Sequence, residues 1–156
     1  MKKVIYNLFF VCLVFSLSSC LKSGLEDLPE YEDANITTVS GVFHRYYSDE
    51  IEPSTGQPRI KDAGLTVGNS RISNDDCTVK MTLTLPGDFP ESEKSKLSLN
   101  KIVMIVGLSS AARISPIGDS PRLGVPGDWS KENKYEVIAA DGSKKVWTIH
   151  VESLTK

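Results

Sequence analysis

The two histidines and Cys77 are the side chains of this chain best suited to metal binding or nucleophilic catalysis. His44 and His150 lie far apart in the sequence, and neither belongs to an HxH or HxxxH pair of the kind expected at a zinc site. A nucleophilic Cys77 would need a histidine base brought beside it by the fold. Because Cys77 opens a run, residues 77–85, with an apolar residue at every second position, we interpret it as a small core residue.

The remaining polar motifs do not match the patterns that catalysis or ion binding requires. Ser109, Ser110 and Ser130 lack the Gly-x-Ser-x-Gly elbow of a serine hydrolase. The acids near residues 49–52 and 74–76 do not have EF-hand spacing, so we interpret them as solvated loop residues. The carboxylate pair of a glycosidase is defined in space and not in sequence, so a small hydrolase stays as a third alternative. We expect a protein that is not an enzyme and that has no cofactor and no metal site.

Cys20 is the thiol with the clearest predicted chemistry. Lys2 and Lys3 precede an apolar stretch, residues 4–17, which is too short to span a bilayer comfortably. The stretch leads into Leu17-Ser18-Ser19-Cys20, which resembles the lipobox of bacterial lipoproteins, where the signal is cut before a cysteine that carries diacylglycerol. We therefore expect residues 1–19 to be a lipoprotein signal peptide and Cys20 to be lipidated. An ordinary secretory signal with an incidental cysteine is the alternative.

Cleavage before Cys20 would leave 137 of the 156 residues, enough for one domain with a core. Since Lys2 and Lys3 are lost, 16 of the 18 basic side chains would remain against 20 acidic ones, which argues against nucleic acid as a partner. Cys77 would be the only free thiol, so no intramolecular disulfide is expected. Residues 20–35 read as a lipidated N-terminus and acidic tether. Glu26-Asp27 loosely resembles the acidic residues near the lipidated cysteine of Bacteroidetes-type surface lipoproteins, which suggests display at the cell surface.

Residues 36–156 are predicted to form one all-β domain. Residues 36–47 are rich in β-branched and aromatic side chains, with Gly41 placed for a bulge. A loop is expected over residues 49–58, a weaker strand over 59–67, and at most one helical turn within 89–98. Residues 101–108 are apolar at successive positions, which predicts a central strand covered on both faces.

The clearest local signal is a hairpin near the C-terminus. Two β-type runs, residues 135–140 and 146–151, flank an Asp141-Gly142 step, which favours a tight turn between strands. Alternation along the second run assigns its side chains to two faces. Trp147, Ile149 and Val151 are expected in the core, and Thr148, His150 and Glu152 toward solvent. With no convincing helix after residue 19, the fold class is an all-β sandwich.

The last 45 or so residues resemble a known family. The segments that carry the likeness are Ile114-Ser115-Pro116, Ser120-Pro121, Gly127-Asp128-Trp129-Ser130, Tyr135-Glu136-Val137, Ala140-Asp141-Gly142-Ser143 and Trp147-Thr148-Ile149-His150-Val151. Together they are similar to the closing segment of immunoglobulin-like domains in Bacteroidetes surface lipoproteins of the DUF5018 type, a group of domains of unknown function. The resemblance implies an immunoglobulin-like sandwich at the cell surface, often beside glycan-import machinery. It implies no catalytic residues.

Three aromatic residues are candidates for contact with a sugar. Tyr46 and Tyr47 end a strand beside an acidic loop, and Trp129 lies in a polar, turn-rich segment. Each could stack on a pyranose ring, although Trp129 is better interpreted as a plug for the end of the sandwich. By analogy of fold, we expect a lipid-anchored protein of the outer membrane, displayed at the cell surface, that binds a glycan or assists an outer-membrane transporter complex in glycan uptake. A structural or adhesive module is the competing hypothesis.

Replacement of Cys20 by alanine should release the exported protein from membranes without unfolding it. The lipid chains on Cys20 would supply the hydrocarbon for anchoring, whereas a single acyl chain gives only marginal binding. The measurement is membrane fractionation of wild-type and Cys20→Ala cells, with Cys77→Ala as the matched cysteine control. A Cys20→Ala protein that is exported, loses its signal and still sediments with the outer membrane would contradict the assignment.

Overall fold

The longest strand, β1 (Ile36–Ile51), is the centre of a three-stranded antiparallel sheet with the order β2-β1-β5. The computed structural model describes residues 31–156, so the predicted signal peptide and Cys20 lie outside the described residues. Pairing with β5 shifts register between Val39 and Gly41, which confirms the bulge. A Cβ at Gly41 would lie 2.5 Å from ring carbons of Phe43, so glycine lets that ring pack against the bulged backbone.

The chain changes sheets at Leu65. Strand β2 (Pro58–Gly64) pairs with β1, and β3 (Thr66–Ser73) pairs with β4 of the other sheet. Our prediction of one strand over residues 59–67 is therefore wrong, because the buried Leu65 is a corner at which the backbone turns from one partner to the other. The predicted loop over residues 49–58 is also shorter than expected. Cross-strand ion pairs, Lys61 with Glu50 and Arg59 with Glu52, accompany the extension of β1 to Ile51.

The second sheet has five strands in the order β3-β4-β8-β7-β6. Its members after β3 are β4 (Thr78–Thr84), β6 (Arg113–Pro116), β7 (Asn133–Ile138) and β8 (Lys144–Thr155). β7 and β8 form the predicted hairpin, and Gly142 adopts the left-handed region, φ 89°, that its turn requires. β4 and β8 pair in parallel, while the other pairs are antiparallel. The strand predicted from residue 77 begins at Thr78, because Cys77 lies in the preceding turn with φ 50°.

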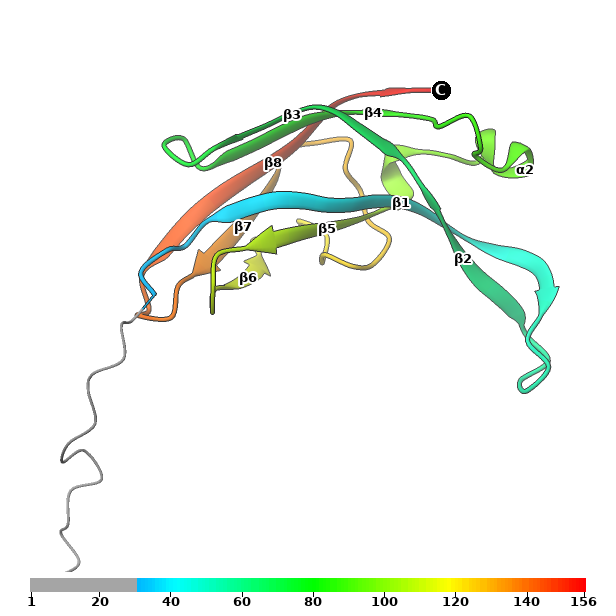
Figure 1. Cartoon of the computed structure of the whole chain (residues 1–156), viewed down its shortest axis with the longest axis horizontal. Helices are drawn as coiled ribbons and strands as arrows, with labels where there is room; N and C mark the ends of the chain where they lie inside the picture. Colours follow the sequence, from blue (N-terminus) through cyan, green and yellow to red (C-terminus); the bar gives the residue numbers. More distant parts are fainter. Residues whose placement is uncertain (1–30) are drawn as a thin grey trace, which may run out of the picture.

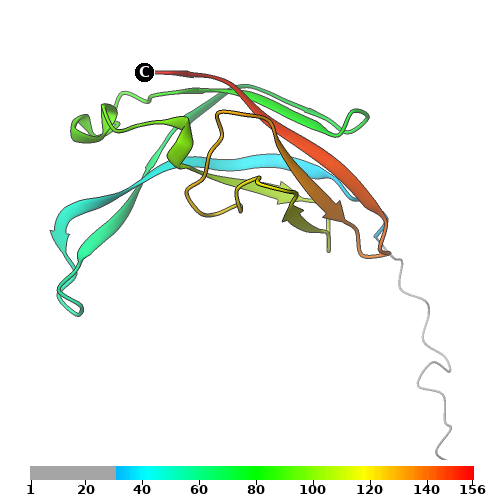
Figure 2. The same cartoon turned by 180° about the vertical axis from the view of Figure 1, so that it is seen from behind.

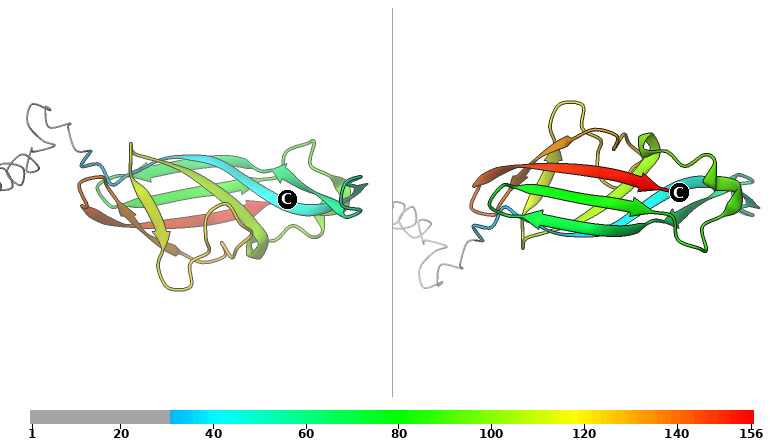
Figure 3. Two further views of the ribbon diagram at one scale, coloured as in Figure 1. Left: turned by 90° about the horizontal axis from the view of Figure 1, so that it is seen from below. Right: turned by 90° about the horizontal axis from the view of Figure 1, so that it is seen from above.

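The two sheets lie face to face, as Figure 1 and the perpendicular views of Figure 3 show. This arrangement confirms the predicted all-β sandwich. β5 (Ile102–Leu108) is an edge strand of the smaller sheet and not the covered central strand that we predicted. Only its first three residues are fully buried, and Ile105 is 43% exposed. The segment before Trp129 runs beside this edge, with backbone hydrogen bonds from Gly124 and Gly127 to Met104 and Ile102.

One helical turn, α2 (Glu91–Lys94), and a short 3-10 helix, η1 (Leu99–Lys101), connect β4 to β5. They confirm that the region holds no longer helix. Pro86 and Pro90 bound the segment before α2, where proline restricts the backbone that precedes it. In residues 31–156 no helix is long and apolar enough to cross a membrane. The connection lies near the part of β1 that extends past β5, at the end of the sandwich opposite the start of the described chain (Figures 1 and 2).

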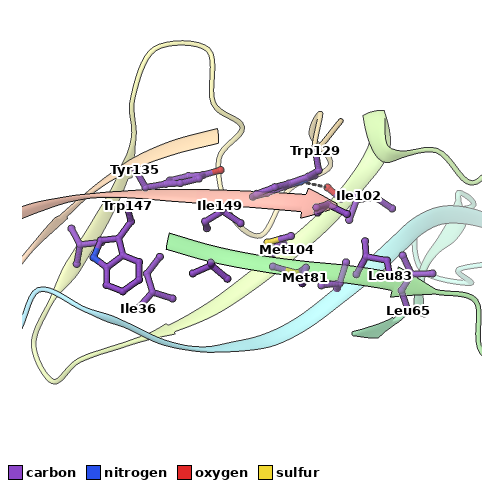
Figure 4. Packing of buried hydrophobic residues seen from close by; sticks show 14 of the residues in the cluster. Ile36, Leu65, Met81, Leu83, Ile102, Met104, Trp129, Tyr135, Trp147 and Ile149 are labelled. Carbon is purple, nitrogen blue, oxygen red and sulfur yellow. Dashed lines mark hydrogen bonds between the residues drawn. The ribbon is translucent and has the colours of Figure 1, made fainter. Parts of the chain in front are cut away.

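Alternate residues of both sheets fill the core (Figure 4). Trp147, Ile149 and Val151 are buried, which confirms the assignment of the β8 core face. Thr148 and His150 are half-buried and Glu152 is exposed on the other face. The Trp147 indole N–H donates to the carbonyl of Ala34, 2.9 Å away. This bond joins the segment that leads into β1 to the last strand of the domain.

Trp147→Ala should lower the free energy of unfolding by about 3–5 kcal/mol, the usual cost of truncating a large buried aromatic in a core. Val146→Ala, one residue earlier and half exposed on the other face, is the matched control and should change it by less than about 0.5 kcal/mol. Urea unfolding of both variants measures the difference. Equal losses would mean that the sandwich does not pack around Trp147.

Candidate functional site

Trp129 is fully buried, although it is one of the three candidate sugar-stacking residues. Its indole N–H donates to the carbonyl of Ile102 at 2.9 Å, and its ring stacks on Tyr135 with centroids 6.2 Å apart (Figure 4). Tyr135 is itself held by a hydrogen bond from its hydroxyl to the carbonyl of Pro121. Trp129 therefore has no face open to a ligand, which corrects its assignment as a binding residue. Its burial and hydrogen bond instead fit the alternative role, a plug for the end of the sandwich.

Tyr46 and Tyr47 point to opposite faces of β1, because consecutive residues in a strand alternate. Tyr46 shares its face with His44, and the two rings are nearly parallel, with an interplanar angle of 9° and centroids 6.2 Å apart. Tyr47 is 72% exposed and lies directly across from Ile60 of β2, which is also exposed. The two predicted tyrosines thus lie on opposite faces of β1, and Tyr46 is on the face through which His44 contacts the β4–β5 connection.

A buried charged contact holds that connection against β1. His44 and Glu93 are 3% and 4% exposed, and Nε2 of His44 lies 3.2 Å from Oε2 of Glu93. The other carboxylate oxygen accepts a hydrogen bond from Lys96 Nζ at 2.8 Å. This bond from Lys96, followed by the one with His44, holds the pKa of Glu93 below its ordinary value despite burial. The carboxylate is therefore charged at neutral pH and satisfied on both oxygens.

The His44–Glu93 pair does not have the geometry of a catalytic base. A base must present its free nitrogen to a substrate, but Nδ1 of His44 is buried and has no hydrogen-bond partner. Phe89 packs against the same ring, with centroids 6.0 Å apart. Cys77 and His150 do not form a dyad either. Cys77 precedes β4 and packs partly against the core, whereas His150 of the neighbouring strand β8 lies on the other face of the sheet.

A hollow of about 460 Å³ opens between β1, β2 and α2. We call it the larger hollow, because it is the larger of the two that Tyr46 lines. Its lining consists of Tyr46, Tyr47, Ser48, Asp49, Glu50, Lys61, Ser92, Glu93 and Lys96. Three carboxylates and two ammonium groups are among these side chains. Lys61 donates to Glu50 at 2.5 Å, and this bond keeps the pKa of Glu50 below its ordinary value. The hollow is thus polar, and Tyr46 and Tyr47 are its two aromatic lining residues.

A second hollow of about 220 Å³ also has Tyr46 in its wall, and we call it the smaller hollow. Its other lining residues are Asp62, Ala63 and Gly64 of β2 with Pro86, Asp88, Phe89 and Pro90 of the β4–β5 connection. Asp62 is engaged by Arg45 at 2.7 and 2.8 Å, which lowers the pKa of Asp62. In residues 31–156, the hollows included, no group of three or more His, Cys, Asp or Glu side chains is placed to hold a metal ion.

Sequence reasoning did not identify the residues that the connection contributes to the site. Ser92, Glu93 and Lys96 belong to a wholly polar stretch, and polar residues are usually solvated. The stretch carries no period that would single out Glu93 as buried. One feature of the sequence did indicate a buried polar partner for β1. His44 occupies a core-facing position two residues after Val42, and a buried imidazole requires a hydrogen-bond partner.

Comparison with known proteins places these features in a family context. The model of the DUF5018-related family matches residues 36–150. A solved structure from Bacteroides fragilis, that of a "putative secreted protein", is 41% identical to the chain, with a TM-score of 0.71. The alignment covers 82% of this chain and 100% of that one. No curated protein matches the chain. These findings confirm the family resemblance that the C-terminal motifs indicated.

Replacing Glu93 with glutamine should destabilise the protein in a pH-dependent manner. Because the pKa of Glu93 is lowered in the folded state, its carboxylate stabilises the fold above the unfolded-state value of 4.5, and this contribution disappears as the pH falls further. The free energy of unfolding of wild type should therefore exceed that of Glu93→Gln at pH 7, and the gap should shrink below pH 4.5. Urea titrations between pH 7 and pH 3 measure the gap.

Glu91→Gln is the matched control, because Glu91 lies in the same helical turn, is exposed and pairs only with Lys94. Its unfolding curve should follow that of wild type at every pH. A Glu93→Gln protein as stable as wild type at pH 7 would contradict a stabilising role for the buried contact.

Proposed function

The chain belongs to the DUF5018-related family, and from this premise we propose that it is a lipid-anchored, non-enzymatic surface protein that binds a glycan beside Tyr46. The observation that carries the proposal is the larger hollow between β1, β2 and α2. It combines an aromatic ring with several hydrogen-bonding side chains. A sugar presents apolar C–H faces and many hydroxyl groups, so it requires both kinds of contact.

The size and polarity of the larger hollow support a polar small ligand. Its volume of about 460 Å³ lies within the range of roughly 300–1,000 Å³ that is usual for ligand sites. Ser92 and Lys61 can donate to sugar oxygens, and Asp49 and Glu50 can accept from sugar hydroxyls. The Ser48 hydroxyl donates to the carbonyl of Arg59, so its oxygen remains as an acceptor. The ring of Tyr46 is covered on the side of His44, which leaves the side toward Ser48 for a sugar face.

The charges of the larger hollow favour a neutral glycan. Its carboxylates outnumber its ammonium groups, and both lysines are paired, Lys61 with Glu50 and Lys96 with Glu93. An anionic polymer would meet net negative charge there, and no pair of free cations is available among the lining residues to bind its acid groups. Binding of a neutral sugar through hydrogen bonds and ring stacking should depend little on salt.

The proposed location is the outer membrane, with Cys20 as the anchor and the domain at the cell surface. The description of the Bacteroides fragilis neighbour as a "putative secreted protein" supports export. The described chain starts at the end of the sandwich that carries the β7–β8 turn, where Ala140 N–H donates to Tyr31 and Ser143 Oγ donates to Glu32. The ends of β1 and β2 and the helical turn α2, which line the larger hollow, are at the opposite end (Figure 2). A ligand could thus be bound at the end remote from the tether, beside an outer-membrane transporter complex.

A structural or adhesive module is the second candidate function, and the outer face of the β1–β2 hairpin favours it. Tyr47 and Ile60 are 72% and 59% exposed and face each other across the two strands. Ile51, near the hairpin tip, is also exposed. Exposed aromatic and aliphatic side chains on a projecting hairpin suit contact with another protein. Tyr47 also lines the larger hollow, whereas Ile60 and Ile51 do not, so variants of Ile60 can distinguish the two functions.

Tyr46→Ala should weaken binding of neutral polysaccharides at least about tenfold, which corresponds to about 1.4 kcal/mol. Isothermal calorimetry of the mature protein, in a detergent without a sugar headgroup, provides the measurement. Tyr46→Phe should bind nearly as well as wild type, because it keeps the ring. Tyr31→Ala, an exposed tyrosine at the opposite end, is the control and should bind normally.

Two outcomes would overturn the proposal. Binding unaffected by Tyr46→Ala would place the ligand elsewhere, and turnover of a bound sugar would show that the protein is an enzyme. Loss of partner-dependent adhesion in Ile60→Ser, with Tyr46→Ala unaffected, would favour the structural module.

A further inference from the structure

Tyr46 is the common wall of the two hollows. The larger hollow adjoins its ring from the side of Ser48, Lys61 and α2, and the smaller hollow from the side of Asp62–Gly64 and Pro86–Pro90. Because both sets of residues come from the same two elements, β2 and the β4–β5 connection, the hollows follow one another along the same junction. A ligand longer than the larger hollow would therefore continue past Tyr46 into the smaller one.

The ring between the hollows is held in place by its neighbours. Tyr46 stacks on His44, and His44 contacts Phe89 of the smaller hollow. His44 is in turn fixed by Glu93 of the larger hollow at 3.2 Å. The three rings and the buried contact thus connect the walls of both hollows. The ring of Tyr46 is therefore already fixed before a ligand binds. Binding loses less side-chain entropy as a result, which reduces its entropic cost.

The smaller hollow differs from the larger one in a way that suits a second sugar unit. Pro86, Pro90 and Ala63 provide apolar surface for C–H groups, and Asp88 is an exposed carboxylate that can accept hydroxyl hydrogens. Asp62 is already occupied by two hydrogen bonds from Arg45. The smaller hollow contains no cationic side chain, so it also favours a neutral unit over an acidic one.

We propose that the ligand is a neutral oligosaccharide of at least two units that lies across Tyr46, with one unit in each hollow. This inference rests on the proposed glycan-binding function and deepens it. An extended peptide could also follow the junction along the free edge of β2. Peptide recognition by strand addition relies on pockets for alternate side chains, whereas the larger hollow is lined mainly by charged and hydroxyl groups. A saccharide therefore fits the lining better.

The test is a length series. The mature protein would be titrated by calorimetry with neutral gluco-, xylo- and manno-oligosaccharides from one to six units, and with a decapeptide library as the alternative ligand. Affinity should rise at least about tenfold between the monosaccharide and the length that fills both hollows, and should then stay level. Asp88→Asn and Ser92→Ala, one variant for each hollow, should each reduce that gain. Asp75→Asn, an exposed acid in the turn before β4, is the matched control and should leave the gain unchanged.

The other outcomes separate the two proposals. Equal affinity for one unit and for six units, still lost in Tyr46→Ala, would overturn the two-hollow inference and leave the proposed function intact. No binding to any saccharide would overturn both. Binding of peptides that depends on Tyr46 and exceeds saccharide binding would replace the saccharide with a peptide ligand. Asp75, Asp88 and Ser92 are exposed, so their variants should fold like wild type. Tyr46 packs against the core, so circular dichroism must show that Tyr46→Ala is folded before its binding is compared.

Discussion

Hydrogen bonding of β1 on both sides is the constraint on which the rest of the structure depends. β2 and β5 fix its backbone, so strict alternation decides which of its side chains face inward. Val42 enters the core, His44 meets the β4–β5 connection, and Tyr46 lies at the hollows. A slip of one residue would turn all three outward and bring Phe43, Arg45 and Tyr47 inward. The core and the candidate site therefore depend on one register.

The contact between β1 and the β4–β5 connection is polar where an apolar contact would have been simpler. Burying a carboxylate costs free energy unless hydrogen bonds compensate, and Glu93 receives them from His44 and Lys96. A buried ionic contact does not in general stabilise a fold more than an apolar contact of the same volume would. It does, however, require specific partners at a specific distance. It positions a connection whose helices are one α-helical turn and a short 3-10 helix, and which has few internal hydrogen bonds of its own. The hollows exist because the connection is held at this place.

Trp129 and Tyr46 show how similar sequence contexts separate in three dimensions. Both are aromatic residues next to polar neighbours, and both suit a sugar ring by type alone. Trp129 closes the core because the segment before it runs along the free edge of β5 and carries the indole to the carbonyl of Ile102. Tyr46 stays at the surface because β1 extends past the end of β5, where the second sheet no longer covers it. The sequence context favoured the buried role of Trp129, whereas residue type alone does not separate the two aromatics.

The amino-acid sequence by itself determined the local structure: the bulge at Gly41, the Asp141-Gly142 hairpin, the core face of β8 and the family. These features depend on neighbouring residues, since alternation and turn chemistry act within a few positions. Only the tertiary structure decided the corner at Leu65, the edge position of β5 and the meeting of His44 with Glu93, 49 residues apart. Such contacts depend on which strands pair and where a connection crosses them. That choice minimises the free energy of the whole chain, and no single segment encodes it.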